Sequence, residues 1–400
     1  MKICKILLSV FSVAALLAAT STTFAETLGD GWERFSDNLI QSDAVDGYRD
    51  LQPGARRIGG LAVDRLNGDL YMCLNGWPFG AYLSKDGGET WVRFDKNGEV
   101  IGGWKRPYSI NMDQDRSGRI AFFRNIPPPH RDYLKESDPM KQISTGWTVD
   151  GGETWMTKIP MPNQAYGARG PLHGMVHWQD EVPQRAIIHM ISKHGTQVTY
   201  DGGETWTEIK EPDMLIEGSH AIDYARTHNE ANPDDPMDYP DLRGYGISGS
   251  GVFFGDNDGI HFKADDAEEF AKVADFQVNG YTPIAISGVL VWAAENGLIY
   301  SSDGGASWQQ LGSELPNVRQ GPFFGKAPQE MVVVTEDGVF GTRDSGQNWT
   351  KVSDLFWVPD AYKKQFGQFL RRHDYDWDPH RNVLYVAALA SHAYRKQLDW

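Results

Sequence analysis

The stretch Ser84-Lys85-Asp86-Gly87-Gly88-Glu89-Thr90-Trp91 places an aspartate, two glycines, hydroxyl residues and a tryptophan within eight positions. Alternating apolar runs flank it, with Ala81-Tyr82-Leu83 before it and Val92-Arg93-Phe94 after it. Such alternation is typical of half-buried strands, and glycine accepts the positive φ of tight turns. The stretch is therefore predicted to be a hairpin turn. It recurs at residues 148–155, 199–206, 301–308 and 342–349, with an eroded copy at 263–270.

Each residue type of the repeat suits a turn between two strands. The Asp carboxylate accepts hydrogen bonds from turn backbone, the hydroxyl accepts or donates them, and the Trp ring packs between neighbouring sheets. The repeat resembles the Asp-box (BNR) repeat of the sialidase-like β-propellers, which also occurs in xyloglucan-specific hydrolases, sortilin-type receptors and a photosystem assembly factor. The resemblance extends over nearly the whole chain after residue 25 and implies a propeller. It implies no single activity, because this architecture serves unrelated functions.

The spacing of the repeat predicts the number of blades. The aspartates of the six copies stand at positions 86, 150, 201, 265, 303 and 344, so successive copies are 64, 51, 64, 38 and 41 residues apart. A four-stranded blade takes about 40 residues, so the longer intervals mark insertions. A seventh blade is predicted from the two termini, since segment 375–386 mirrors segment 61–72 and Gly31-Trp32-Glu33-Arg34-Phe35 mirrors residues 90–94. We therefore expect an all-β, seven-bladed β-propeller closed by N- and C-terminal strands that share one blade.

Composition and charge restrict the class of protein. The 400 residues are 40% hydrophobic and include 43 Gly, 21 Pro and 14 Trp, as in an all-β chain with many turns. Acidic residues outnumber basic ones by 54 to 38, which gives a formal net charge of −16. That balance argues against nucleic acid as a partner, because nucleic-acid binding relies on broad basic surfaces.

The first 25 residues have the features of a secretory signal. Lys2 and Lys5 precede an apolar run over residues 6–19, and Ala25 ends a small-residue cleavage site. The predicted organisation is a signal peptide over residues 1–25 and one propeller domain over residues 26–400, secreted or periplasmic after cleavage. No membrane anchor is expected, because no later stretch is apolar for 18 residues. Cys73 lies in an apolar run and is predicted to fill a core, without an internal disulfide.

The binding site is expected at the face opposite the repeated turns, where loops lead from each outer strand into the next inner strand. The repeat aspartates themselves are predicted to be structural. A cation or an aromatic residue recurs just before the inner strands of this otherwise acidic chain, and Arg binds carboxylates through its planar fork. The expected partner is an anionic oligo- or polysaccharide carrying uronate, sialate or sulfate, with no metal and no cofactor; a structural role for these residues, pairing with carboxylates of neighbouring blades, stays open. The candidate binding residues are Arg57, Trp104, Arg106, Arg169, His220, Tyr281, Arg319, Arg371 and His373.

Two enzymatic classes and one binding class remain open. The loop with Tyr166, Arg169 and His173 is similar to the equipment of propeller polysaccharide lyases, in which His or Tyr moves protons while Arg neutralises the uronate. This makes His173 and Tyr166 the catalytic candidates. A hydrolase would instead use two carboxylates about 6.5 to 9.5 Å apart if it inverts. Loop candidates for such carboxylates are Glu217, Asp223, Asp256 and Asp258.

Literal sialidase activity is not expected. The nearest string to the sialidase Phe-Arg-Ile-Pro motif is Phe123-Arg124-Asn125-Ile126-Pro127, which has an extra Asn and follows the first repeat instead of preceding it. The alternative to catalysis is a propeller that only binds a glycan or a protein. The acidic, proline-broken loop over residues 229–241 is the feature that favours a protein contact.

Overall fold

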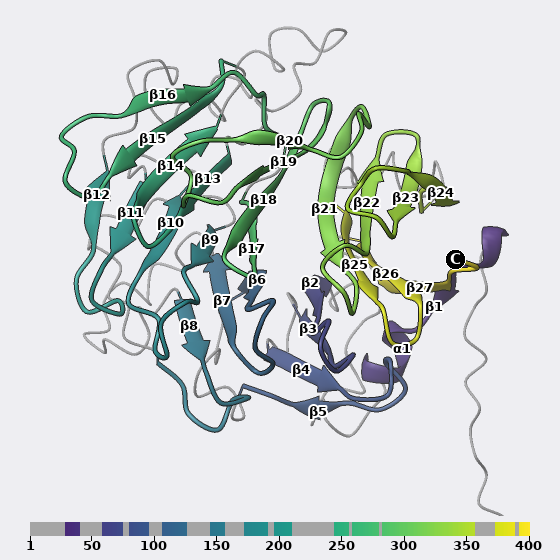
Figure 1. The fold of residues 1–400 in the computed structure, drawn as a ribbon. Helices are drawn as coiled ribbons and strands as arrows, with labels where there is room; N and C mark the ends of the chain where they lie inside the picture. Colours follow the sequence, from purple (N-terminus) through teal and green to yellow (C-terminus); the bar gives the residue numbers. More distant parts are fainter. Residues whose placement is uncertain are drawn as a thin grey trace, which may run out of the picture.

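The computed structural model describes residues 29–40, 58–74, 80–95, 106–125, 145–156, 172–190, 196–209, 244–255, 258–279, 282–356, 373–388 and 392–400. Within these ranges the chain is almost entirely β, with a three-residue 3-10 turn η1 (Gly29–Gly31) and one short helix, α1 (Ser36–Ile40). The strands form seven antiparallel sheets, which are arranged as blades in a ring (Figure 1). The predicted seven-bladed β-propeller is confirmed.

The first three blades follow the chain in order. Blade 1 contains β2 (Ile58–Val63), β3 (Leu70–Leu74), β4 (Gly80–Ser84) and β5 (Val92–Arg93); blade 2 contains β6 (Arg106–Met112), β7 (Ile120–Asn125) and β8 (Thr145–Thr148); and blade 3 contains β9 (Leu172–Val176), β10 (Ala186–Met190), β11 (Thr196–Thr199) and β12 (Thr207–Ile209). Blade 2 has no fourth strand among the described residues, but Met156 forms a bridge with Trp147 where that strand would lie.

The remaining blades complete the ring. Blade 4 contains β13 (Gly244–Ile247), β14 (Gly251–Gly255), β15 (Ile260–Ala264) and β16 (Ala271–Ala274); blade 5 contains β17 (Ile284–Ile286), β18 (Val289–Ala294), β19 (Gly297–Ser301) and β20 (Gln309–Leu311); blade 6 contains β21 (Val318–Phe324), β22 (Met331–Thr335), β23 (Gly338–Thr342) and β24 (Thr350–Ser353); and blade 7 contains β1 (Glu33–Arg34), β25 (His373–Asp378), β26 (Val383–Ala388) and β27 (Ala393–Gln397). First strands of successive blades contact one another, as β6 contacts β2 and β9, so these strands surround the axis of the ring.

The repeated segments are turns between the third and fourth strands, as predicted; we call them the aspartate turns. In blade 3, Asp201 Oδ1 accepts hydrogen bonds from the Thr199 hydroxyl at 2.8 Å and from the Thr205 amide at 2.9 Å. Its Oδ2 accepts the Thr205 hydroxyl at 2.5 Å. Gly203 has a φ of 90° and donates its amide to the Thr199 hydroxyl at 2.8 Å. These local hydrogen bonds lower the pKa of Asp201 to about 2.

Large apolar side chains fill the seams between blades. Phe35 packs between Trp91 of the first aspartate turn and Tyr385 of β26, with ring centroids 6.3 Å and 5.3 Å away. On the other side of blade 7, Trp32 contacts the Phe356 ring edge-on at 5.2 Å. Cys73 is fully buried within blade 1, as predicted from its apolar run. The ring is therefore held by separate aromatic and aliphatic clusters between neighbouring sheets.

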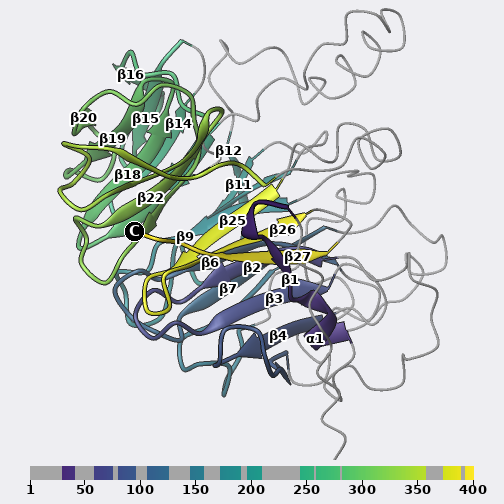
Figure 2. The ribbon, with the colours of Figure 1, turned by 90° about the vertical axis from the view of Figure 1, so that its right-hand side faces the viewer.

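Blade 7 closes the ring with strands from both ends of the sequence. β1 pairs with β27, with Glu33 opposite Arg395 and Arg34 opposite Tyr394, and Figure 2 shows β1 alongside β27. The Phe35 amide adds a hydrogen bond to the Ala393 carbonyl at 3.2 Å. The Arg395 guanidinium bonds the Glu33 carboxylate at 3.0 and 3.1 Å. The predicted sharing of one blade by the termini is confirmed.

None of the described helices is long and apolar enough to cross a membrane. The predicted signal peptide over residues 1–25 lies outside the described residues.

Replacing Asp201 by Ala is expected to lower the free energy of unfolding at pH 7 by about 1 kcal/mol, because three donors lose their acceptor at an exposed site. The pKa of Asp201 is lowered in the folded chain, so this stabilisation is present above about pH 4 and is lost as the pH falls toward about 2. Urea denaturation at pH 7 and pH 2.5 measures both effects. Glu204→Ala, at an exposed position of the same turn, is the matched control, and an equal loss in the two variants would contradict the assignment.

Candidate functional site

The two ends of the ring are distinguished by the direction of the first strands. This direction shows at which end each predicted binding residue lies. The turns after β2, β6, β9, β17, β21 and β25 contact one another at one end, which we call the turn end. The same first strands therefore begin at the opposite end, the strand-start end. Arg106 and His373 are the first residues of β6 and β25, and His173 and Arg319 are the second residues of β9 and β21.

Four of the predicted residues thus begin first strands at a common end of the ring. The structure places the backbone of these four residues at the strand-start end, and their role in binding stays a prediction. The other predicted residues, Arg57, Trp104, Tyr166, Arg169, His220, Tyr281 and Arg371, lie outside the described residues, as do Glu217, Asp223 and Asp256.

Arg319 has a described side chain and lies on a β-bulge. Val318 pairs with Thr335 and Gln320 pairs with Val334, so Arg319 is an extra residue on β21. Bulges re-aim side chains at the rims of sheets. The Arg319 guanidinium forms an ion pair with Glu336, in the turn between β22 and β23, and the two side chains are 41% and 53% exposed. Its fork therefore already holds a carboxylate, as the structural alternative predicts, and an exposed pair of this kind is weak.

Among the described residues, polar side chains do not assemble into a metal centre. The described residues contain no group of three or more His, Cys, Asp or Glu side chains placed to hold an ion. His173 belongs to β9, whereas His177 follows that strand at the turn end, where burial lowers its pKa. Asp258 pairs with Lys272 at 3.4 Å and lies 3.8 Å from His261, whose Nε2 is buried.

At the turn end, polar groups from five blades meet across the axis, and we call Arg65, Gln114, Asp115, Ser287, Gly325, Lys326 and His380 the axial cluster. The Ser287 amide of blade 5 donates to Asp115 of blade 2 at 2.6 Å. Arg65 of blade 1 donates to the Gln114 carbonyl at 2.7 Å and to the Gly325 carbonyl of blade 6 at 2.8 Å. His380 Nε2 lies 3.0 Å from the Arg65 carbonyl. These contacts occupy the axis at the turn end.

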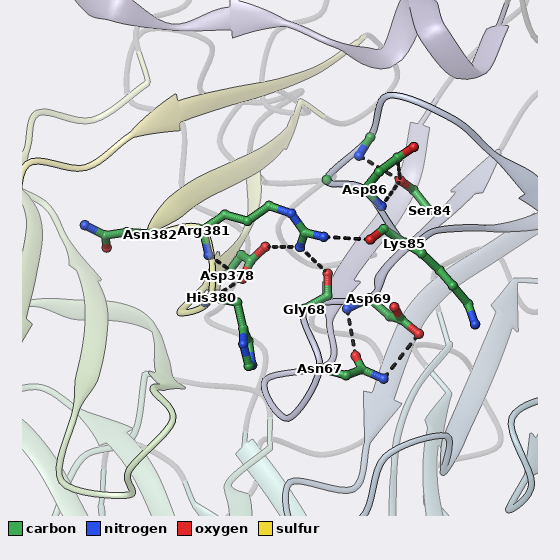
Figure 3. A network of polar contacts seen from close by, with 12 residues as sticks. Asn67, Gly68, Asp69, Ser84, Lys85, Asp86, Asp378, His380, Arg381 and Asn382 are labelled. Atoms are coloured by element: carbon green, nitrogen blue, oxygen red, sulfur yellow. Dashed lines mark hydrogen bonds and ion pairs between the residues drawn. The ribbon is translucent and has the colours of Figure 1, made fainter.

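Arginines just before the second strands of blades 7 and 2 join these blades to the next blade at the turn end. Arg381 donates to the Gly68 and Lys85 carbonyls of blade 1 at 2.7 and 2.6 Å while it pairs with Asp378 (Figure 3). Arg119 bonds the carbonyls of Trp178 and Asp180 in blade 3 in the same way, each at 2.5 Å. Backbone carbonyls left open by the turns thus receive charged donors from the neighbouring blade.

A sequence pattern that was not among the predicted site features marks these turn-end residues. An aspartate stands at the end of the first strand or directly after it in blades 1, 2 and 7, at Asp64, Asp113 and Asp378. Each accepts the amide two residues later, with distances of 3.0, 2.8 and 2.7 Å. The mirrored segments 61–72 and 375–386 each contain this aspartate followed by Arg and Asn, which is the pattern of a polar inter-blade turn.

In three first strands, a side-chain oxygen accepts a hydrogen bond from a backbone amide of the next first strand. The Asn111 side-chain oxygen accepts the Val176 amide of the next first strand at 3.2 Å, and Gln320 accepts the Tyr375 amide at 3.0 Å. Asp376 Oδ2 accepts the Val63 amide at 2.7 Å, and its Oδ1 accepts the Trp377 amide at 2.8 Å. An unpaired edge amide would be costly, and blades 2, 6 and 7 each supply an acceptor to the next blade.

Asp376 differs from Asn111 and Gln320 because its side chain can ionise. Burial raises its pKa to about 7, and the nearby Asp378 acts in the same direction, while the two amide donors act against them. The carboxyl therefore exchanges its proton near neutral pH.

The comparisons with known proteins found similar solved structures but no family. No family model matches the sequence, and no curated protein matches it. Among solved structures, YCF48 from Cyanidioschyzon merolae is 11% identical, with 92% of this chain and 99% of that chain covered and a TM-score of 0.43. A GH74 enzyme from Niastella koreensis is 12% identical, with 86% and 52% covered and a TM-score of 0.45. Likeness at this level carries no activity over to this chain.

Arg65→Met is expected to lower the free energy of unfolding by about 2 to 4 kcal/mol, because the buried guanidinium leaves three backbone carbonyls without donors. Arg116→Met, at an exposed position two residues after Gln114, is the control and should cost less than about 0.5 kcal/mol. Chemical denaturation measures both variants. Equal small losses would show that the axial cluster does not hold the turn end.

Asp376→Asn is expected to stabilise the chain above pH 7. The raised pKa means that the folded chain favours the protonated carboxyl, so its stability falls as the pH rises from about 4 to about 7 and then levels. The Asn side-chain oxygen still accepts the Val63 amide but does not ionise. Between about pH 4 and about pH 7, the free energy of unfolding of the variant should therefore rise by roughly 2 to 4 kcal/mol relative to that of the parent.

The matched variant for this prediction is Asn111→Asp, which introduces a carboxyl at the equivalent position of blade 2. It should acquire the pH dependence that Asp376→Asn loses. Unfolding free energies between pH 4 and 8 measure both, and a parent curve that is flat between pH 5 and 7.5 would contradict the raised pKa.

Proposed function

We propose that this chain is an exported, carbohydrate-active propeller that binds and cleaves an anionic glycan at the strand-start end of its axis, as a glycoside hydrolase or polysaccharide lyase. The observation that carries the proposal is the axial cluster. Because its contacts cross the axis at the turn end, a ligand reaches the axis from the strand-start end. Arg106, His173, Arg319 and His373 begin their strands there.

The residue types at this end support chemistry on an acidic sugar. Arg169 and Arg319 are proposed to bind the acidic group, and His173 or Tyr166 to move the proton at the reacting carbon. The first strand of blade 7 also places two acidic residues, Asp374 and Asp376, on the same side of β25. A lyase would use the His, Tyr and Arg set, whereas a hydrolase would use a carboxyl pair.

Two further parts of the proposal follow from the sequence. The aspartate turns support membership in the Asp-box, sialidase-like group of propellers, since their carboxylates and hydroxyls make the hydrogen bonds that the repeat predicts. Residues 1–25 support export by a cleaved signal peptide, which leaves the propeller secreted or periplasmic.

A propeller that binds without cleaving is the second candidate. It is favoured by one observation, the ion pair between Arg319 and Glu336, because this guanidinium already has a carboxylate partner within the chain. Such a propeller would bind a glycan or a protein across its strand-start end and would keep the pair of Arg319 and Glu336 as a structural contact.

The test is digestion of a panel of uronate, sialylated, sulfated and neutral glycans. Absorbance from a new C4=C5 double bond would identify a lyase, and new reducing ends without that absorbance would identify a hydrolase. Arg169→Ala should weaken binding or turnover of the acidic glycan about tenfold to a hundredfold, as expected for the loss of a charge-assisted contact.

Arg343→Ala is the matched control, because Arg343 lies in the aspartate turn of blade 6 and packs over the Trp400 ring at 5.1 Å. It should leave binding and turnover unchanged. Binding of acidic glycans without turnover would favour the second candidate. Binding of neutral glycans or of a protein alone would refute the anionic ligand.

A further inference from the structure

His392 connects the two ends of the chain through its imidazole. It directly precedes β27, and its Nδ1 lies 3.2 Å from the Ser36 hydroxyl and 3.6 Å from Asp37 Oδ1. Ser36 and Asp37 begin α1, which follows β1 (Figure 2). Ser36 is buried, whereas the side chains of His392 and Asp37 are 28% and 25% exposed, so water can exchange protons with them. The imidazole is therefore a titratable contact between the N-terminal part of the chain and blade 7.

The N-terminal segment, residues 33–40, is attached to blade 7 by a short backbone ladder. Glu33 and Arg34 pair with β27, and the Phe35 amide donates to the Ala393 carbonyl at 3.2 Å. Beyond that point the segment is held by side chains, such as the buried Leu39. Segments with few backbone partners open locally at a lower free-energy cost than core strands. A single side-chain contact can therefore change how often this segment opens.

The charged groups near His392 come from α1, β1 and β27. Asp37 on α1 also pairs with Arg34 on β1, with 2.8 Å between Arg34 Nη2 and Asp37 Oδ2. On β27 itself, the Tyr394 ring lies edge-on to the imidazole, with ring centroids 6.5 Å apart. The remaining described charges of the closure pair with one another, namely Glu33, Glu89 and Arg395. Carboxylates and guanidinium groups do not ordinarily titrate between pH 5.5 and 8, whereas imidazoles do.

Protonation of His392 changes the electrostatics of this contact. The neutral imidazole shares one hydrogen bond with the Ser36 hydroxyl, whereas the imidazolium is also attracted to the Asp37 carboxylate. Asp37 then bridges two cations, one on each oxygen, and Arg34 reduces the gain because it already neutralises part of the same charge. A partly exposed ion pair typically shifts an equilibrium by about twofold to fivefold.

We propose that His392 and Asp37 form a pH-dependent clasp that closes the ring, in which the protonated imidazole holds the N-terminal segment against β27. The stabilisation is present below about pH 6, where an imidazole is ordinarily charged, and is lost as the pH rises toward about 8. The clasp acts on the seam between blades 7 and 1, because the Asn38 side chain of the same segment donates to the Gly88 carbonyl at 3.1 Å. It regulates closure of the ring and does not depend on the proposed function.

The test is hydrogen exchange of the full chain at pH 5.5 and pH 8.0, resolved to single amides by fragmentation and mass spectrometry. The Phe35 amide reports opening of the segment. After correction for the intrinsic pH dependence of exchange, its protection in the parent should be about twofold to fivefold higher at pH 5.5. His392→Gln can keep a hydrogen bond to Ser36 but cannot ionise, so this difference should disappear. It retains Asp376, so any pH dependence caused by that carboxyl remains in both proteins.

The Asn279 amide, which donates to the Ala293 carbonyl in blade 5, is the internal reference. Its protection ratio between the two pH values should be the same in parent and variant, and loss of its protection would reveal a misfolded chain. His380→Gln is the matched control, because it removes another partly buried imidazole of blade 7, at the turn end. It should keep the pH dependence that the parent shows at Phe35.

Asp37→Asn provides a second variant that leaves the imidazole in place. It should also lose the difference between the two pH values, and its Phe35 protection should be lower at both, because Arg34 loses its partner. A parent in which Phe35 protection is the same at both pH values would overturn the clasp. So would a pH dependence that persists unchanged in His392→Gln and Asp37→Asn.

Discussion

The pairing of Glu33 and Arg34 with Arg395 and Tyr394 is the contact on which the rest of the ring depends. A propeller blade left without its outer strand exposes an unpaired edge and leaves its seam with the next blade incomplete. Here the strand that completes blade 7 also brings Phe35 into the seam with blade 1, against Trp91 and Tyr385. Arg395 continues this closure by donating to the Gly87 carbonyl in the first aspartate turn. A contact between the two ends of the chain therefore fixes the positions of blades 7 and 1 together.

Closure of the ring allows contacts across the axis that no single blade could form. The Arg65 guanidinium reaches the Gly325 carbonyl, 260 residues away in sequence, and Asp115 accepts the Ser287 amide, 172 residues away. Such contacts require the five contributing turns to be at fixed distances from the axis. They give the two ends of the ring different characters: the turn end is joined by arginines and backbone carbonyls, and the strand-start end presents the first residues of the inner strands.

The same geometry explains the unusual carboxyl of Asp376. Its acceptor role belongs to a series in which one first strand serves the next, and the other described members of the series, Asn111 and Gln320, are neutral. The raised pKa of Asp376 comes from burial between blades 7 and 1, which exists only in the closed ring.

The sequence by itself determined the turns, the strands and the number of blades. Those features rest on local chemistry: the Asp201 carboxylate bonds residues within four positions, and alternation of apolar residues needs no distant partner. The blade shared by the termini was also predictable, because Trp32-Glu33-Arg34-Phe35 repeats the pattern of an outer strand. For the site, the sequence determined which cations begin the first strands, as with Arg319. Only the tertiary structure decided that Arg319 pairs with Glu336, that Arg65 spans the axis and that Asp376 titrates near pH 7. Partner choice and pKa depend on distances and burial that arise when blades remote in sequence meet, and residue patterns along the chain do not encode them directly.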